Sequence, residues 1–97
     1  MTPTEEVFYI HNDFLVTFIA NEDLADCDIR VGYISPTSQI SKYDVPTSMD
    51  KEINQVHFLV LKTMNTIPGK WKFWIEDTNK DRLVADSTEI IVTVKKH

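Results

Sequence analysis

Short runs of apolar and β-branched residues recur along the chain, and each run is bounded by turn-forming residues. The clearest run is 70–76, where the pattern repeats every two residues, as it does in a β-strand with two different faces. The same alternation recurs in 87–95, and the two segments are expected to pair as a C-terminal hairpin. The predicted inward residues are Trp71, Phe73, Ile75, Ile90, Val92 and Val94, and the outward residues of the first segment are Lys72, Trp74 and Glu76.

Four further segments are predicted to be strands because they are rich in β-branched and aromatic residues and fit a helical period poorly. They are 7–10, 14–20, 29–34 and 53–62. The first two could be separate strands or one bent strand that changes sheets at Asn12-Asp13.

Two segments carry weaker signals. Residues 39–45 are predicted to be a short edge strand, because Pro36 and Pro46 flank them and proline is confined to the edges and ends of sheets. Residues 47–52 are predicted to form a single helical turn, because Ser48 precedes Glu52 near the spacing of a helix cap.

About seven short strands in a chain of 97 residues indicate a single all-β domain, residues 1–97, with the architecture of an antiparallel sandwich. The segment 68–77, followed by 90–94, resembles the final hairpin of bacterial immunoglobulin-like domains, in which a Pro-Gly turn leads into a Trp or Tyr strand and a Val-rich strand closes the chain. The resemblance covers about a third of the sequence, and the chain lacks the paired cysteines of antibody-type domains. It implies an immunoglobulin-like β-sandwich and no particular ligand.

The formal net charge of −5 argues against nucleic acid and anionic membranes as partners, because the chain would repel a phosphate backbone. The acidic N-terminus does not resemble a secretory signal, and no apolar run approaches the roughly 20 residues that span a bilayer. The cytoplasm is therefore favoured. Cys27 is the one cysteine, so no disulfide forms within the chain, and a buried or half-buried thiol is expected.

Residue patterns that could bind a metal are incomplete. Asp77-x-Asn79-x-Asp81 begins like a calcium loop, but Arg82 replaces the required glycine and Thr88 replaces the bidentate glutamate, so an ordinary Asx turn is expected. The acidic run 22–28 is expected to be a solvated loop, and the three histidines share no ligand spacing. No metal site and no cofactor are predicted.

Signatures of catalysis are equally scarce. Two glycines cannot build a phosphate-binding loop, and neither a nucleophile elbow nor a zinc-binding helix motif occurs. An enzymatic function is therefore not predicted.

Apolar residues are in surplus on faces that should meet water. In 56–61, Phe58 and Val60 alternate with Leu59 and Leu61, so both faces of the strand are apolar. Bulges, sheet twist or a covering loop could bury the second face, or it could be a partner surface. A partner surface predicts a non-enzymatic protein-interaction or structural module. It would bind another protein or form a homodimer through a surface of Trp74, Leu59, Leu61, Lys72 and Glu76.

Two alternatives remain open. The chain could bind a small ligand or carbohydrate, with Trp74 stacked on a sugar ring. It could also be an inhibitor or accessory protein that acts through the loops 21–28 and 34–46.

Overall fold

The computed structural model of the chain describes residues 4–20, 23–79, 82–84 and 90–96. Within these ranges the secondary structure consists of β-strands, and no helix occurs. The strands are β1 (Thr4–Tyr9), β2 (Phe14–Ile19), β3 (Ile29–Ile34), β4 (Lys42–Asp44), β5 (Ser48–Asp50), β6 (Gln55–Val60), β7 (Gly69–Asp77), β8 (Arg82–Leu83) and β9 (Ile90–Lys95).

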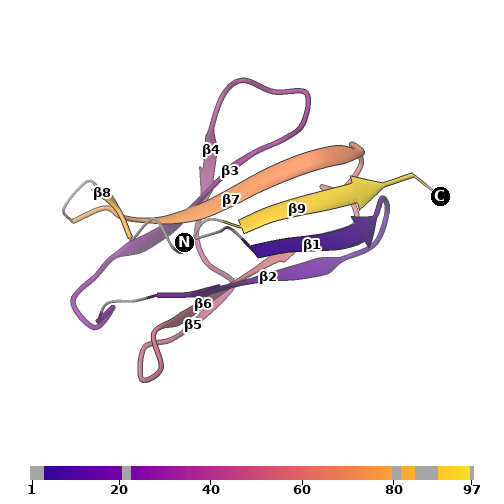
Figure 1. Cartoon of the computed structure of the whole chain (residues 1–97). Coiled ribbons are helices and arrows are strands. Elements are labelled where there is room, and N and C mark those ends of the chain that lie inside the picture. The colour runs from indigo at the N-terminus through magenta and orange to yellow at the C-terminus, as the bar shows by residue number, and fades with distance from the viewer. Residues whose placement is uncertain (1–3, 21–22, 80–81, 85–89, 97) are drawn as a thin grey trace.

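The strands form two sheets that lie face to face (Figure 1). The larger sheet has the order β1-β9-β7-β3-β4, with the two-residue β8 paired to β7, and the smaller sheet has the order β2-β6-β5. The all-β class and the two-sheet sandwich are thereby confirmed. The prediction of about seven strands is too low, and the prediction of a purely antiparallel fold is wrong for one pair, because β1 lies parallel to β9.

The first apolar region forms two strands in different sheets, β1 in the larger and β2 in the smaller. The chain crosses between the sheets near the predicted Asn12-Asp13, and His11 takes a left-handed conformation with φ 68°. The crossing is fixed by Asn65, whose carbonyl accepts a hydrogen bond from the His11 amide at 2.8 Å. The buried Asn65 side chain donates to the carbonyls of Tyr9 and Asn12. These bonds satisfy backbone groups at the crossing between the two sheets.

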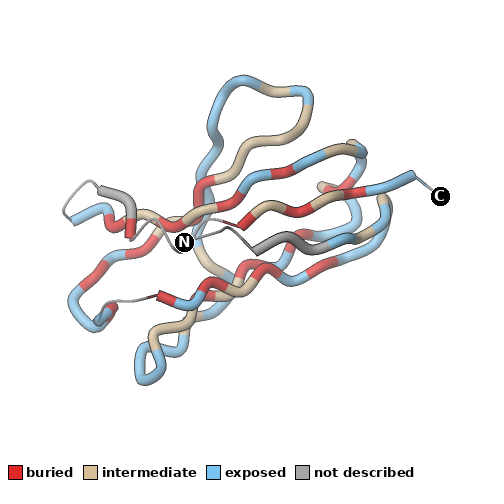
Figure 2. The backbone as a smooth tube through the Cα atoms, in the orientation of Figure 1, coloured by how far each residue is buried: buried red, intermediate tan, exposed pale blue. Residues whose placement is uncertain are grey.

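The core lies between the sheets, and Figure 2 shows buried residues alternating with more exposed residues along the strands. Trp71, Phe73 and Ile75 on β7 are at most 3% exposed, as the alternation predicts. Across the sandwich, the Phe73 ring lies 6.1 Å from that of Phe14 and 6.3 Å from that of Phe58. The predicted inward residues of β9, Ile90, Val92 and Val94, are also buried.

The predicted helical turn at 47–52 is wrong, because Ser48–Asp50 is strand β5 at the edge of the smaller sheet. The pairing of β5 with β6 and the hydrogen bond from the Thr47 amide to the His57 carbonyl give these residues long-range partners. Such partners outweigh a local capping preference. The predicted edge strand at 39–45 is confirmed for a shorter segment, β4, which lies at the edge of the larger sheet.

The antiparallel pairing predicted for the C-terminal hairpin is confirmed between β7 and β9, but the two strands are not consecutive, because β8 lies between them in the chain and also pairs with β7. Residues 87–89 of the predicted second strand lie outside the described residues. The turn after β7 follows the predicted Asx pattern, because the Asp77 carboxylate accepts a hydrogen bond from the Asn79 amide at 3.0 Å. Asp81 and Thr88, the other positions of the calcium-like spacing, lie outside the described residues.

Candidate functional site

The outer face of the larger sheet carries a group of aromatic and charged residues from three adjacent strands. Gly32 on β3 is paired with Trp74 on β7 and with Tyr43 on β4, so the three residues lie in one row across the sheet. Gly32 has no side chain, and the Trp74 indole lies over it. A Cβ atom at Gly32 would come within 2.3 Å of the indole Nε1 and Cε2 atoms. Tyr43 meets the indole edge to face, with ring centroids 6.5 Å apart.

Glu76 joins this row to the neighbouring one. Its Oε2 accepts a hydrogen bond from the Trp74 indole Nε1 at 2.7 Å. Its Oε1 accepts two bonds from Arg30, from Nε at 3.0 Å and from Nη2 at 2.5 Å. The Arg30 guanidinium carbon in turn lies 4.2 Å from the centroid of the Tyr43 ring, within cation–π range. We call Arg30, Gly32, Tyr43, Trp74 and Glu76 the outer-face cluster.

The electrostatics of the cluster favour an ionised Glu76. Burial alone would raise the pKa of this carboxyl. Hydrogen bonds from Trp74 and Arg30, the positive charge of Arg30 and a hydrogen bond from Tyr43 outweigh that effect and lower the pKa below its ordinary value. Glu76 is therefore a carboxylate near neutral pH, and its charge is neutralised by Arg30.

Chemically, the cluster is suited to binding. Both carboxylate oxygens of Glu76 are occupied as acceptors, and a carboxyl with a lowered pKa is a weak proton donor near neutral pH. The rings and the guanidinium are fixed in place while Tyr43 remains 48% exposed. Groups held rigidly before contact lose little conformational entropy when a partner binds.

The structure divides the predicted surface residues between two sides of the molecule. Trp74 and Glu76 belong to the outer-face cluster, and Lys72 lies beside them as an exposed residue on the same face of β7. Leu59 lies on the outer face of the smaller sheet, 37% exposed, and Leu61 follows β6 at 50% exposed. The predicted residues therefore cannot form one continuous patch.

The outer face of the smaller sheet is more aliphatic. Leu59 is paired with Leu15, and Ile19 lies further along β2 on the same face. Leu15 is 48% and Ile19 63% exposed. Between them, Thr17 Oγ1 and His57 Nδ1 lie 3.0 Å apart and form a polar pair. This face is half apolar and half polar, in contrast to the aromatic and charged cluster opposite.

Three cluster residues, Arg30, Gly32 and Tyr43, are missing from the prediction. Each lies outside the strand that carries Trp74, and only the register of β3 and β4 against β7 brings them to the indole. The one available signal in the sequence is the alternation in 29–34. It places Arg30 and Gly32 on one face of the strand and the buried Ile29 and Val31 on the other.

Other residue types with reactive chemistry are dispersed or enclosed. Cys27 is buried, as predicted, and its Sγ lies 3.7 Å from the carbonyl oxygen of Asp23. Within the described ranges, no group of three or more His, Cys, Asp or Glu side chains could hold a metal ion. In the same part of the chain no helix is long and apolar enough to cross a membrane.

Comparison with known proteins supports the fold alone. No model of a known protein family matches the chain, and no curated protein sequence matches it. The fold resembles part of a proposed glycoside hydrolase from Bacteroides vulgatus ATCC 8482, known from a crystal structure at 1.80 Å resolution. The TM-score is 0.53 and the sequence identity 9%, and the match covers 97% of this chain but 16% of the other. The chain thus corresponds in size to one small part of that protein.

Proposed function

We propose that the chain is a non-enzymatic interaction module of immunoglobulin-like type that binds a second copy of itself through the outer-face cluster. The single observation that carries the proposal is the cluster itself, in which a Trp, a Tyr and an Arg are held by mutual contacts on rigid strands. These three residue types are enriched among the residues that contribute most to protein–protein affinity.

The strand order supports the immunoglobulin-like part of the proposal. In immunoglobulin domains, strands B, E and D form one sheet, and G, F and C form the other, which an additional strand C′ can extend. The orders β2-β6-β5 and β9-β7-β3-β4 follow the same arrangement when β2 takes the place of B and β9 that of G. The N-terminal β1 adds to the outside of β9.

The charge of the cluster is compatible with a second copy as the partner. The whole chain carries a net charge of −5, which opposes association between identical molecules. Within the cluster, however, Arg30 and Glu76 neutralise each other. Two copies related by a twofold axis can therefore bring their clusters together without bringing a net charge into the interface, and each cluster offers both a cation and aromatic rings.

The smaller sheet is the weaker candidate for the interface. Its exposed apolar side chains are leucine and isoleucine, and leucine is under-represented among residues that dominate binding energy. The polar pair of Thr17 and His57 also interrupts this apolar face.

The test compares two matched substitutions on opposite faces, Trp74→Glu and Leu59→Glu, by light scattering over a concentration series. We expect wild-type protein and Leu59→Glu to associate and Trp74→Glu to remain monomeric, with the β-type circular dichroism spectrum unchanged in all three. Loss of association in Leu59→Glu alone would move the interface to the smaller sheet. A wild-type protein that is monomeric at every concentration would refute self-association.

A second candidate function is carbohydrate binding, and the observation that favours it is the likeness to part of a proposed glycoside hydrolase. In this case the half-buried Trp74 would stack on a sugar ring. Calorimetric titration with soluble plant and bacterial polysaccharides would show heat of binding that Trp74→Ala abolishes. Absence of binding to every polysaccharide would leave the protein-interaction proposal alone.

A further inference from the structure

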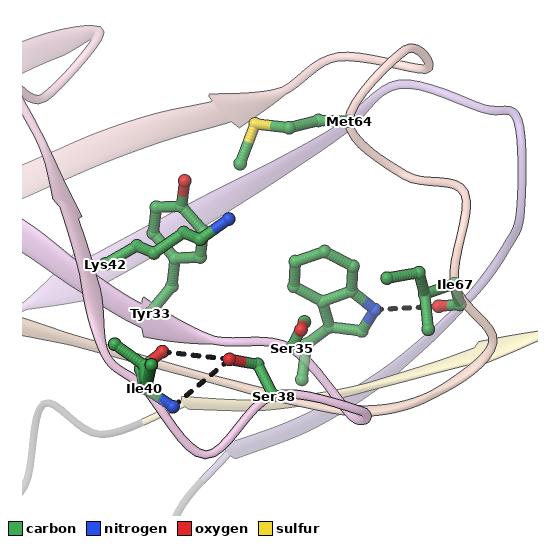
Figure 3. A pocket seen from close by; sticks show the side chains of 8 residues that line it. Tyr33, Ser35, Ser38, Ile40, Lys42, Met64 and Ile67 are labelled. Atoms are coloured by element: carbon green, nitrogen blue, oxygen red, sulfur yellow. Dashed lines mark hydrogen bonds between the residues drawn. The ribbon is translucent and has the colours of Figure 1, made fainter.

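A pocket of about 120 Å³ opens at one end of the sandwich, apart from the outer-face cluster (Figure 3). Its walls come from the inner face of the larger sheet and from the two loops at that end. Tyr33 and Trp71 contribute aromatic rings, Met64 and Ile67 contribute apolar groups from the loop after β6, and Lys42 contributes an amine from β4.

The apolar walls are held in place by hydrogen bonds. The Trp71 indole Nε1 donates to the Ile67 carbonyl at 2.9 Å, which fixes the loop after β6 against the ring. The indole has no further donor to give, and because Trp71 is only 3% exposed it contributes buried ring carbons to the lining of the pocket. The half-buried Tyr33 ring stacks beside the Trp71 indole, with the centroids 6.4 Å apart and an angle of 29° between the ring planes.

The opposite rim is held as well. The Ser38 amide donates to the Ser35 carbonyl at 3.2 Å, and the Ser38 hydroxyl bonds to the backbone of Ile40, as Figure 3 shows. Gly69 allows this turn to approach β7, since a Cβ atom there would lie 2.7 Å from Pro36 Cβ, and its φ of +129° suits glycine. The pocket is thus a built feature of the fold.

The volume limits the ligand to about one six-membered ring. An apolar protein cavity of about 150 Å³ accommodates benzene, so a pocket of about 120 Å³ is of the right order for a single aromatic or sugar ring. The half-buried Tyr33 ring can make an aromatic contact with either kind of ring.

The charge of the pocket comes from Lys42. Lys42 is paired with Tyr33 across β3 and β4, so both side chains lie on the same face of the sheet. In Figure 3 the amine of Lys42 points from its strand toward the side of the pocket where Ile67 lies. In the part of the chain that the structure describes, no carboxylate forms an ion pair with this amine. A cation at the rim of an aromatic pocket favours a ligand with an anionic group.

Tyr33 adds a hydrogen-bond donor. Burial, together with the negative charge of Asp44, raises the pKa of the Tyr33 hydroxyl. It therefore remains protonated well above neutral pH and can donate a hydrogen bond to an anionic or hydroxyl group of a ligand.

We propose that this pocket binds a small ligand consisting of one six-membered ring with a carboxylate group, the ring against Tyr33 and next to Trp71, and the carboxylate at Lys42. An aromatic acid and a uronic acid both present this chemistry. The site is separate from the outer-face cluster, so it stands or falls independently of the proposed self-association.

The two tryptophans of the chain make a direct test possible. The indole N–H groups of Trp71 and Trp74 give separate signals in a ¹H–¹⁵N correlation spectrum, and a Trp74→Phe variant assigns them. Benzoate and galacturonate are titrated separately, with benzyl alcohol and galactose as neutral counterparts. We expect at least one of the two acids to shift the Trp71 signal along a saturable curve and to leave the Trp74 signal in place.

Which acid binds identifies the source of the ligand, aromatic or sugar. If neither acid produced a saturable shift of the Trp71 signal, the proposal would be refuted. Equal binding of an acid and its neutral counterpart would also refute it.

Lys42→Met tests the assignment of the charge, because it keeps the length of the side chain and removes the amine. Loss of one charge-assisted hydrogen bond should weaken acid binding about tenfold or more. Lys70→Met is the matched control, since Lys70 is an exposed lysine on β7 that does not line the pocket. Unchanged affinity in Lys42→Met, or an equal loss in Lys70→Met, would contradict the proposed site.

Discussion

Trp71 is the residue that joins the sandwich core to the loop after β6. Its ring is 3% exposed and stacks on Phe73, and its indole nitrogen bonds to the Ile67 carbonyl. Trp71→Ala should lower the free energy of unfolding by about 3–5 kcal/mol through loss of buried surface and formation of a cavity. Chemical denaturation measures this value. Lys70→Ala serves as the control, because Lys70 is an exposed neighbour of Trp71 on the opposite face of β7. An unchanged midpoint in Trp71→Ala would show that the ring is not in the core.

Glu76 makes stability depend on pH. Its pKa is lowered in the folded state relative to the ordinary value of 4.5, so the unfolded chain binds a proton first as the pH falls. The contribution of this carboxylate is complete above the ordinary pKa and is lost as the pH falls through the lower, folded value. Wild-type protein should therefore melt at a higher temperature than Glu76→Gln at pH 7, and the difference should narrow in acid. A difference that is constant with pH would show that the Glu76 charge does not stabilise the fold.

At the level of the strands, Gly32 on β3 provides the space that Trp74 on β7 occupies. Because an added methyl group would overlap the indole, Gly32→Ala should displace the ring from Glu76 and destabilise the protein by about 1–3 kcal/mol. The cost should largely disappear in the background of Trp74→Ala, where the overlapping ring is gone. Thermal melting of the two single variants and the double variant tests this coupling. Equal costs in both backgrounds would mean that the glycine is required for another reason.

The strands differ in how well the sequence predicts them. The buried rows of β7 and β9 follow from alternation, because a period of two assigns each side chain to a face without knowledge of the neighbouring strand. β5 does not follow, because its three residues have local capping signals and become a strand only through pairing with β6. The parallel pairing of β1 with β9 joins strands at opposite ends of the chain, and no local pattern encodes it.

At the level of the whole molecule, the two-sheet arrangement decides which surface residues can act together. The excess of apolar residues on outward faces is visible in the sequence, but the assignment of β6 and β7 to different sheets separates Leu59 from Trp74. The same arrangement brings Arg30 and Tyr43 to Trp74 from separate strands. The pattern along β7 predicts two of the five cluster residues, and the register between strands supplies the other three.

The central claim is that two copies of the chain meet through the outer-face cluster, and the indole signals of Trp74 and Trp71 test it within one sample. ¹H–¹⁵N correlation spectra are recorded as the protein is concentrated. The Trp74 signal and the amides of Arg30 and Tyr43 should shift with concentration, while the Trp71 signal and the amides of Leu15 and Leu59 stay in place. Shifts confined to Leu15 and Leu59, or a spectrum that does not change with concentration, would contradict the claim.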